Sequence, residues 1–168
     1  MLKHCLQEID FARYQRWLDR AMGVKTPFMV CDCDGLVVWN DGVSRATELA
    51  LSMSTGDDKE QSGVCRLDLD DRSTALHQSL GRTKEGLLGR AAVIVECFAG
   101  DDAPINLDHL TEAMEDLCAS IHDEYVRSAD LEMMTEELGA RYEELHLVYA
   151  VDQHVRNQTE GHESVFQS

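Results

Sequence analysis

The chain has 168 residues, of which 43% are hydrophobic, and this is enough for one domain with its own core. Its formal net charge is −17 at pH 7, and residues 101–168 contribute most of it, with 17 Asp or Glu against 3 Arg and no Lys. An acidic surface repels phosphate groups and anionic lipid, so we expect neither nucleic acid nor a membrane as a partner.

The sequence also predicts a cytoplasmic protein. No stretch approaches the roughly 18 apolar residues of a membrane span, and the first residues lack the apolar core of a signal peptide. Six cysteines in a chain without a secretion signal are more typical of reduced thiols than of a disulfide framework.

The first predicted element is a helix over residues 2–22. Its apolar residues recur every three or four positions, and Gly23 is a natural terminator. The stripe expected to face the core consists of Leu2, Leu6, Ile9, Ala12 or Arg13, Trp17 and Ala21.

A β-hairpin is expected next. Two runs rich in β-forming residues lie within 26–40, and Asp34-Gly35 between them is the strongest short hairpin signal in the chain. Residues 44–53 then favour a helix, with Ser44 as a candidate N-cap, and the polar residues 55–63 favour a loop.

Three further strands are predicted, over 64–69, 74–82 and 87–98. The run 87–98 is the most apolar segment of the chain and is expected to be the central strand. The order of elements indicates an α+β fold with a mainly antiparallel sheet, flanked by the N-terminal helix and by a long C-terminal coiled-coil helix.

That long helix is predicted from a heptad repeat over residues 107–149. Its a and d positions are mostly apolar, Asn106 can cap its start, and no proline follows Pro104. Such a helix would be roughly 65 Å long, more than a domain of this size can bury alone, and we therefore expect a parallel homodimer.

The expected dimer interface is this seam, supported by the N-terminal helix. In a parallel pair Arg127 at position g reaches Glu132 at position e of the other copy. The predicted interface residues are Leu107, Leu110, Met114, Leu117, Ile121, Leu131, Leu138, Tyr142, Leu145 and Tyr149.

The middle of the seam is polar. Glu124 and Ser128 occupy consecutive d and a positions, and Thr135 and Gly139 weaken the next stretch. One interpretation is a signal relay at Glu124, Ser128 and Thr135 that shifts between two packings. The other is an ordinary coiled coil with a solvated patch, since polar core positions also fix register.

The hairpin with Asp34-Gly35 and the run Gly86-Leu-Leu-Gly-Arg-Ala-Ala-Val-Ile-Val95 resemble the sheet hairpins of GAF- and PAS-type sensor domains. The run 134–149 is similar to signalling helices that join such sensors to output modules in bacterial regulators. Those modules include diguanylate cyclases, cyclic-di-nucleotide phosphodiesterases and histidine kinases.

The resemblance implies three regions: a sensor core over residues 1–105, a dimerising signalling helix over 106–150, and a linker or the start of a C-terminal output domain over 151–168. It implies a regulatory sensor that transmits a signal through the coiled coil, with any small ligand between the sheet and the loop near 54–63. The alternatives are a ligand-free structural dimerisation module and a small enzyme.

Few residues suggest chemistry. Cys31 and Cys33 at i and i+2 are expected on one face of a strand, and His77 on a predicted strand is a candidate for facing a pocket. These three are the weak ligand-binding candidates. No catalytic motif, metal-ligand spacing or required cofactor is evident, and we expect no enzymatic activity.

Overall fold

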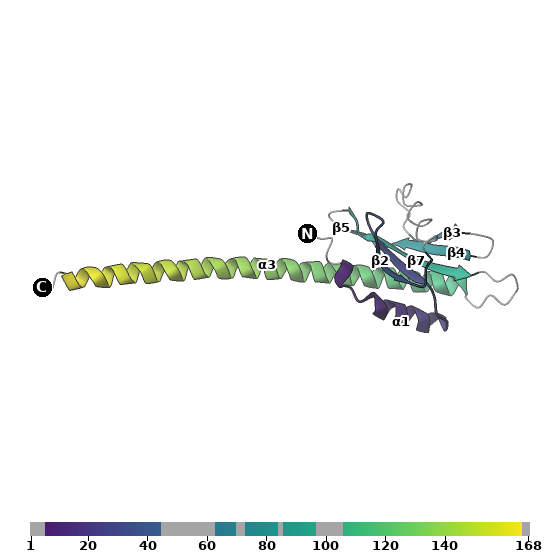
Figure 1. The fold of residues 1–168 in the computed structure, drawn as a ribbon, viewed down its shortest axis with the longest axis horizontal. Coiled ribbons are helices and arrows are strands. Elements are labelled where there is room, and N and C mark those ends of the chain that lie inside the picture. Colours follow the sequence, from purple (N-terminus) through teal and green to yellow (C-terminus); the bar gives the residue numbers. More distant parts are fainter. Residues whose placement is uncertain (1–5, 45–62, 70–72, 84–85, 97–105, 166–168) are drawn as a thin grey trace. The chain divides into compact units, whose positions relative to one another are not determined.

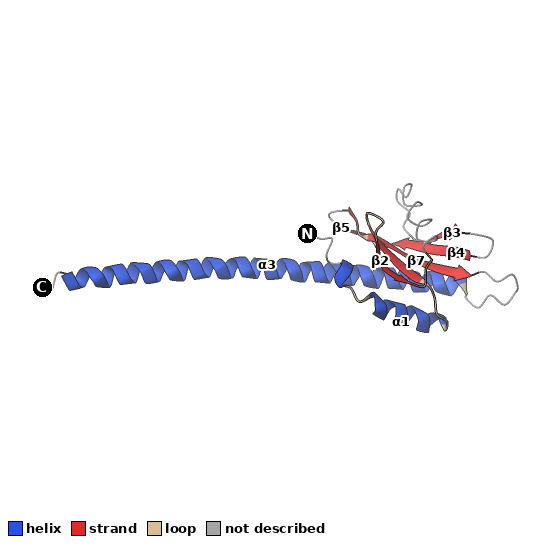
Figure 2. Ribbon diagram, viewed as in Figure 1, coloured by secondary structure: helices blue, strands red, loops and turns tan. Residues whose placement is uncertain are grey.

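The computed structural model describes residues 6–44, 63–69, 73–83, 86–96 and 106–165. It divides into two compact units, Met1–Val126 and Arg127–Ser168, each of which is described by itself. The class is α+β, as the order of elements predicts (Figures 1 and 2). The predicted helix 44–53 and loop 55–63 lie outside the described residues, apart from Ser44 and Gly63.

The first unit is built on a five-stranded antiparallel sheet in the order β2-β1-β7-β4-β3. Its strands are β1 (Phe28–Asp32), β2 (Val37–Asp41), β3 (Cys65–Asp68), β4 (Ser73–Ser79) and β7 (Gly89–Glu96). The short strands β5 (Arg82–Thr83) and β6 (Gly86–Leu87) form a separate two-stranded ribbon. The most apolar run of the sequence becomes β7 and is the central strand, which confirms that prediction.

The predicted hairpin is formed by β1 and β2. The Asp32 carboxylate accepts hydrogen bonds from the backbone N–H groups of Asp34 and Leu36, each at 2.9 Å. Gly35 has φ +79°, a conformation that glycine adopts without strain. The turn therefore falls at the Asp34-Gly35 pair that the sequence indicates.

The N-terminal helix is shorter than predicted. A single 3₁₀ turn covers residues 6–8, and α1 begins only at Phe11 and ends at Met22. Asp10 separates the two because its backbone is not helical and its carboxylate accepts a hydrogen bond from the Arg13 N–H at 3.3 Å. The expected stop at Gly23 is confirmed by its left-handed conformation.

The buried face of α1 also differs from the predicted stripe. Phe11, Tyr14 and Leu18 are buried, whereas Trp17 is 42% exposed. The sequence pattern places Trp17 in the buried stripe because it assumes one continuous helix from residue 2. In the structure α1 begins only after Asp10, so its buried face follows the spacing of Phe11, Tyr14 and Leu18 instead.

The long C-terminal helix is α3, Leu107–Val165. Asn106 caps it as predicted, since its side-chain oxygen accepts from the N–H groups of Asp108 at 2.9 Å and His109 at 3.3 Å. The helix continues 15 residues beyond the expected end at 150, so residues 151–165 are helical. No helix in the described part of the chain is long and apolar enough to cross a membrane.

The start of α3 packs on the sheet of its own chain. Its residues Leu110, Met114, Leu117, Ile121 and Tyr125 are at most 3% exposed. They belong to one core cluster with residues of α1, β1, β4 and β7. The first half of the predicted dimer seam is thus buried within its own chain. It covers the apolar face of the sheet, which would otherwise be exposed to water.

A second, smaller cluster lies on the other face of the sheet. The buried residues of this cluster are Met29, Cys31, Val43, Ala75 and Ala92. The alternation of Phe28 and Val30 in one cluster with Met29 and Cys31 in the other follows the two-residue period of a strand. Both faces of the central strands are therefore apolar.

Two glycines test this fold. A Cβ on Gly89 would lie 2.3 Å from the carbonyl oxygen of Cys31, while a Cβ on Gly139 in α3 would meet nothing within 4 Å. We expect Gly89→Ala to lower the free energy of unfolding by about 2 kcal/mol. Gly139→Ala should raise the stability of its helix by up to about 1 kcal/mol. Urea denaturation followed by circular dichroism measures both, and equal effects would contradict the packing of β1 on β7.

Candidate functional site

The predicted ligand candidates Cys31 and Cys33 do not share a strand face. β1 ends at Asp32, and Cys33 lies in the turn, where it is exposed. Cys31 is buried in the smaller core cluster. The strand ends early because the Asp32 carboxylate binds the backbone of the turn, so the i and i+2 spacing does not bring the two thiols together.

His77 is partly buried on β4, on the same face of the sheet as Cys31 but not beside it. It is paired with Ala92, and Ala92 with Met29, which places Cys31 two strands away and two residues further along. That separation is roughly 12 Å from the standard strand spacings. Among the described residues no group of three or more His, Cys, Asp or Glu is placed to hold a metal ion.

Cys118 lies in the core beneath the sheet and is 2% exposed. Burial, with a smaller contribution from the Glu115 charge, raises the pKa of its thiol to about 12. A thiol in that state is a poor nucleophile, so Cys118 serves packing rather than chemistry.

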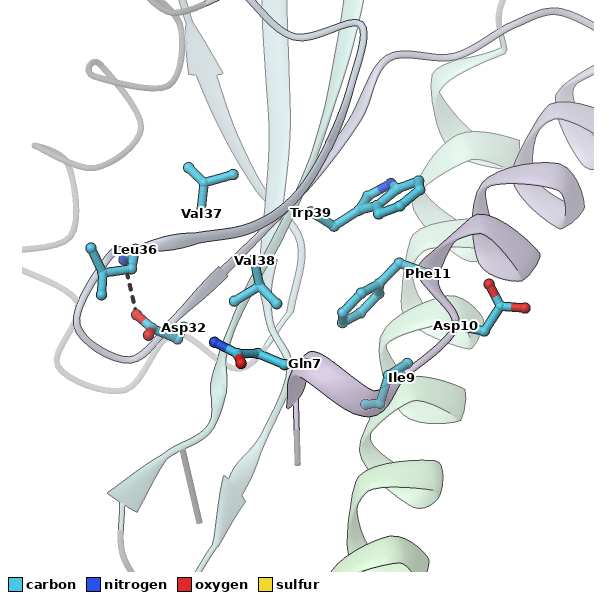
Figure 3. Close-up of a pocket in the computed structure, with 9 residues that line it drawn as sticks. All are labelled: Gln7, Ile9, Asp10, Phe11, Asp32, Leu36, Val37, Val38 and Trp39. Carbon is cyan, nitrogen blue, oxygen red and sulfur yellow. Dashed lines mark hydrogen bonds between the residues drawn. The ribbon is translucent and has the colours of Figure 1, made fainter. Parts of the chain in front are cut away.

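The first unit contains an open groove of about 520 Å³ between the chain before α1 and the β1–β2 hairpin (Figure 3). We call it the β2 groove. Its lining residues are Gln7, Ile9, Asp10, Phe11, Asp32, Leu36, Val37, Val38 and Trp39. The volume is in the range of sites that bind small molecules or peptide side chains.

A bulge in β2 shapes this groove. The pairing of β1 with β2 matches Val30 with Trp39 and Cys31 with Val37, so Val38 is the additional residue. As a result Val38 and Trp39 both pack against the large core cluster, although neighbours on a regular strand point to opposite faces. Figure 3 shows Val38 and Trp39 on the side of Gln7 and Phe11.

The aromatic wall of the groove is formed by Phe11 and Trp39, whose ring centroids are 6.4 Å apart at an angle of 33°. The indole nitrogen of Trp39 is buried, and no described residue accepts a hydrogen bond from it. A buried N–H without an acceptor costs roughly 1–3 kcal/mol. This donor is enclosed by the fold, so the groove itself presents mainly the apolar surface of the two rings.

A cluster of polar side chains links α1 to α3. The Glu124 carboxylate accepts hydrogen bonds from Tyr14 and from the guanidinium of Arg13. The Tyr14 hydroxyl is also 3.2 Å from the carbonyl oxygen of Ser120, and the Arg13 guanidinium carbon lies 4.8 Å from the Tyr14 ring centre. Burial, and then the hydrogen bond to Glu124, raise the pKa of Tyr14, so it remains a neutral donor at physiological pH.

This cluster changes the interpretation of one predicted relay residue. Glu124 occupies a d position of the predicted seam, yet its carboxylate is bound to α1 of the same chain. Sequence reasoning missed Arg13 and Tyr14, and the only signal for them was an acidic residue at a position that is usually apolar. The groove residues Trp39 and Phe11 were missed as well, because a bulge has no reliable sequence signature.

The second unit, Arg127–Ser168, has its own candidate surface. Six large apolar side chains recur on α3 every three or four residues and are between 57% and 76% exposed. We call them the α3 stripe: Leu131, Met134, Leu138, Tyr142, Leu145 and Tyr149. Five of the six are predicted interface residues. Of the other two relay residues, Thr135 donates to the carbonyl of Leu131 at 2.8 Å and Ser128 lies at the start of this unit.

The comparisons with known proteins leave the family open. No family model matches the chain, and no curated protein matches it. Among solved structures it is similar to the crystal structure of a Roadblock/LC7 domain from Streptomyces avermitilis, with 18% sequence identity and a TM-score of 0.43. The similarity covers 64% of this chain and 93% of that one.

The thiols provide the first test of the site geometry. At neutral pH iodoacetamide should alkylate Cys33 readily, whereas the raised pKa lowers the thiolate fraction of Cys118 roughly a thousandfold. Mass spectrometry of proteolytic peptides measures both rates. Cys118 should react once the chain is unfolded in urea, and equal rates in the folded chain would contradict its burial.

The second test addresses Glu124. Replacing its carboxylate in Glu124→Gln removes the charged acceptor of Tyr14 and Arg13, and we expect a loss of about 1 kcal/mol in the free energy of unfolding. Glu112→Gln, an exposed change on the same helix, is the matched control and should have almost no effect. Urea denaturation measures the free energy of unfolding of both variants. If Glu124→Gln leaves it unchanged, the cluster does not contribute to stability.

Proposed function

We propose that this chain is a regulatory dimerisation module whose two copies associate in parallel through the α3 stripe. The observation that carries the proposal is the exposure of six large apolar side chains at coiled-coil spacing on one face of a helix. Such a stripe is unfavourable in water and is buried when a second helix packs against it.

The charges beside the stripe favour a second copy of the same chain as the partner. Glu136, Glu137, Glu143 and Glu144 fall at b and c positions, which face away from a dimer seam. In a parallel pair the g position of one copy approaches the e position of the other five residues on. Arg127 then approaches Glu132 of the other copy, an oppositely charged pair.

The finer proposal is a sensor that transmits a signal along α3 to an output module following it in a longer protein. Its support is the polar run of the heptad at Glu124, Ser128 and Thr135, where helix packing is weakest. In this scheme the bond of Glu124 to α1 holds one state, and its release permits a different packing at Ser128 and Thr135. The resemblance to GAF and PAS sensors is the only indication of the sensor class.

Two matched double variants test the dimer. Leu138→Asp with Leu145→Asp changes the stripe, while Met133→Asp with Leu147→Asp changes equally exposed side chains on the opposite face of α3. Burying a leucine side chain is worth roughly 1.5–3 kcal/mol, so the first variant should raise the dimer dissociation constant at least about a hundredfold. The second should leave it nearly unchanged.

Sedimentation velocity at tens of micromolar measures the outcome against a chain mass of 18.9 kDa. The unchanged chain and the opposite-face variant should sediment as dimers, and the stripe variant as a monomer. A monomeric unchanged chain would refute the proposal. Equal dissociation of both variants would place the interface elsewhere.

A further inference from the structure

The outer surface of α1 combines arginines with an exposed tryptophan. Arg13, Trp17 and Arg20 fall at i, i+4 and i+7 of this helix, so they lie in one row over two helical turns. Arg16 is the neighbour of both arginines of this row. All four side chains are exposed, Trp17 to 42%. We call these four residues the α1 arginine face.

This positive surface stands out in a chain whose formal net charge is −17. α1 contains three Arg and one acidic residue, Asp19. The Asp19 carboxylate accepts hydrogen bonds from the Gln15 side chain and from the Thr26 N–H, both at 2.9 Å. At physiological ionic strength, exposed charges more than about 8 Å apart are largely screened from one another. The distant acidic residues therefore do not cancel the attraction of this face for a docked carboxylate.

The three arginines have donors available for a further acceptor. A guanidinium has five N–H donors, and the bonds of Arg13 within the polar cluster both use its Nη2 nitrogen. Arg16 approaches Asp10 only to 3.9 Å, which is longer than a hydrogen bond. No residue in the described part of the chain forms an ion pair with Arg20. Carboxylates of a partner can therefore bind here while Arg13 keeps its bond to Glu124.

A largely apolar pocket of about 180 Å³ adjoins this face. It is lined by Arg13, Tyr14 and Trp17 from α1 and by Leu117 and Ser120 from α3. Tyr14 and Leu117 are buried, whereas the other three are exposed. An apolar cavity of roughly 150 Å³ is large enough to hold benzene, so this pocket has the size of one large apolar side chain.

From these observations we infer that the α1 arginine face and its pocket bind a helical segment of a partner protein in which acidic residues flank a large apolar one. The apolar side chain enters the pocket beside Trp17, and carboxylates one helical turn before and after it pair with Arg13 and Arg20. A helix suits this surface because its own residues at i, i+4 and i+7 repeat the spacing of the row.

The residue types of this surface support an interface. Trp, Tyr and Arg are enriched among the residues whose truncation weakens protein complexes most. All residues of the face and the pocket belong to the first unit, so the inference does not depend on the proposed dimer.

The test uses a phage-displayed peptide library selected on the full chain. Enriched peptides should contain an apolar residue between two acidic ones at one-turn spacing. Trp17→Ala removes one wall of the pocket and should raise the dissociation constant of an enriched peptide at least about tenfold. Met133→Ala, which shortens an exposed apolar side chain in the second unit, is the matched control and should bind as the unchanged chain does.

A pair of charge variants forms the second arm. Arg20→Gln removes one exposed positive charge and should weaken binding about two- to fivefold. Arg82→Gln, an exposed change on β5, should have no effect. If Trp17→Ala fails to fold, the shift of the Trp17 indole N–H signal in the unchanged chain on peptide addition provides the readout.

A second copy of the chain is the competing occupant. Asp130, Met134 and Glu137 of α3 also place an apolar residue between two acidic ones at this spacing. A synthetic peptide of residues 127–149 should therefore be added as a competitor, and it should displace the enriched peptide at least about tenfold less well than unlabelled enriched peptide does.

Four results would overturn the inference. They are no enrichment above an uncoated surface, enriched peptides without acidic residues, equal binding by Trp17→Ala and Met133→Ala, and displacement by the 127–149 peptide at equal affinity. The last result would make this face a contact between copies of the chain.

Discussion

An antiparallel sheet with apolar residues on both faces must be covered, and in this chain α1 and the start of α3 cover one of them. Leu18 from α1 and Leu110, Met114 and Ile121 from α3 are fully buried against Phe28, Val30 and Val93 of the sheet. This contact determines which face of α1 is buried and how much of the apolar seam of α3 remains exposed. The rest of the structure depends on it.

The same heptad pattern consequently has two different partners along one helix. Up to Tyr125 its apolar residues are buried in the first unit, and from Leu131 onward they are exposed. Glu124, near the end of the buried part, is bound to Arg13 and Tyr14 on α1 of the same chain. A seam that is continuous in sequence is thus half core and half surface, and only the exposed half supports the proposed dimer.

Much of the fold follows from local sequence signals. The Asp34-Gly35 turn, the Asn106 cap and the apolar run of β7 each depend on short-range chemistry and could be predicted from neighbouring residues. The buried face of α1 and the surface against which α3 packs could not be predicted in this way. Hydrophobic periodicity indicates that a stripe will be buried, but it does not indicate what will bury it. The apolar stripe of α3 could be buried either by the sheet or by α3 of a second copy. Only the tertiary packing shows that the sheet buries its first half.

The site was less accessible to sequence reasoning than the fold. Cys31, Cys33 and His77 were chosen for their chemistry, but the early end of β1 and the strand register keep them apart. The β2 groove arises from a bulge that turns Val38 to the side of Trp39, and the bulge depends on pairing with β1. Residues without a chemical signature, Phe11 and Trp39, form its aromatic wall.

The proposed dimer requires two parallel copies of α3 that pack in register beyond Arg127. Pulsed electron paramagnetic resonance measures this when single spin labels are attached at position 132 or, in a separate sample, at position 146, after the reactive thiols have been replaced. Helices that pack side by side lie about 8–10 Å apart, so both positions should give one short distance between copies. A long distance at either position, or no coupling between copies at tens of micromolar protein, would contradict it.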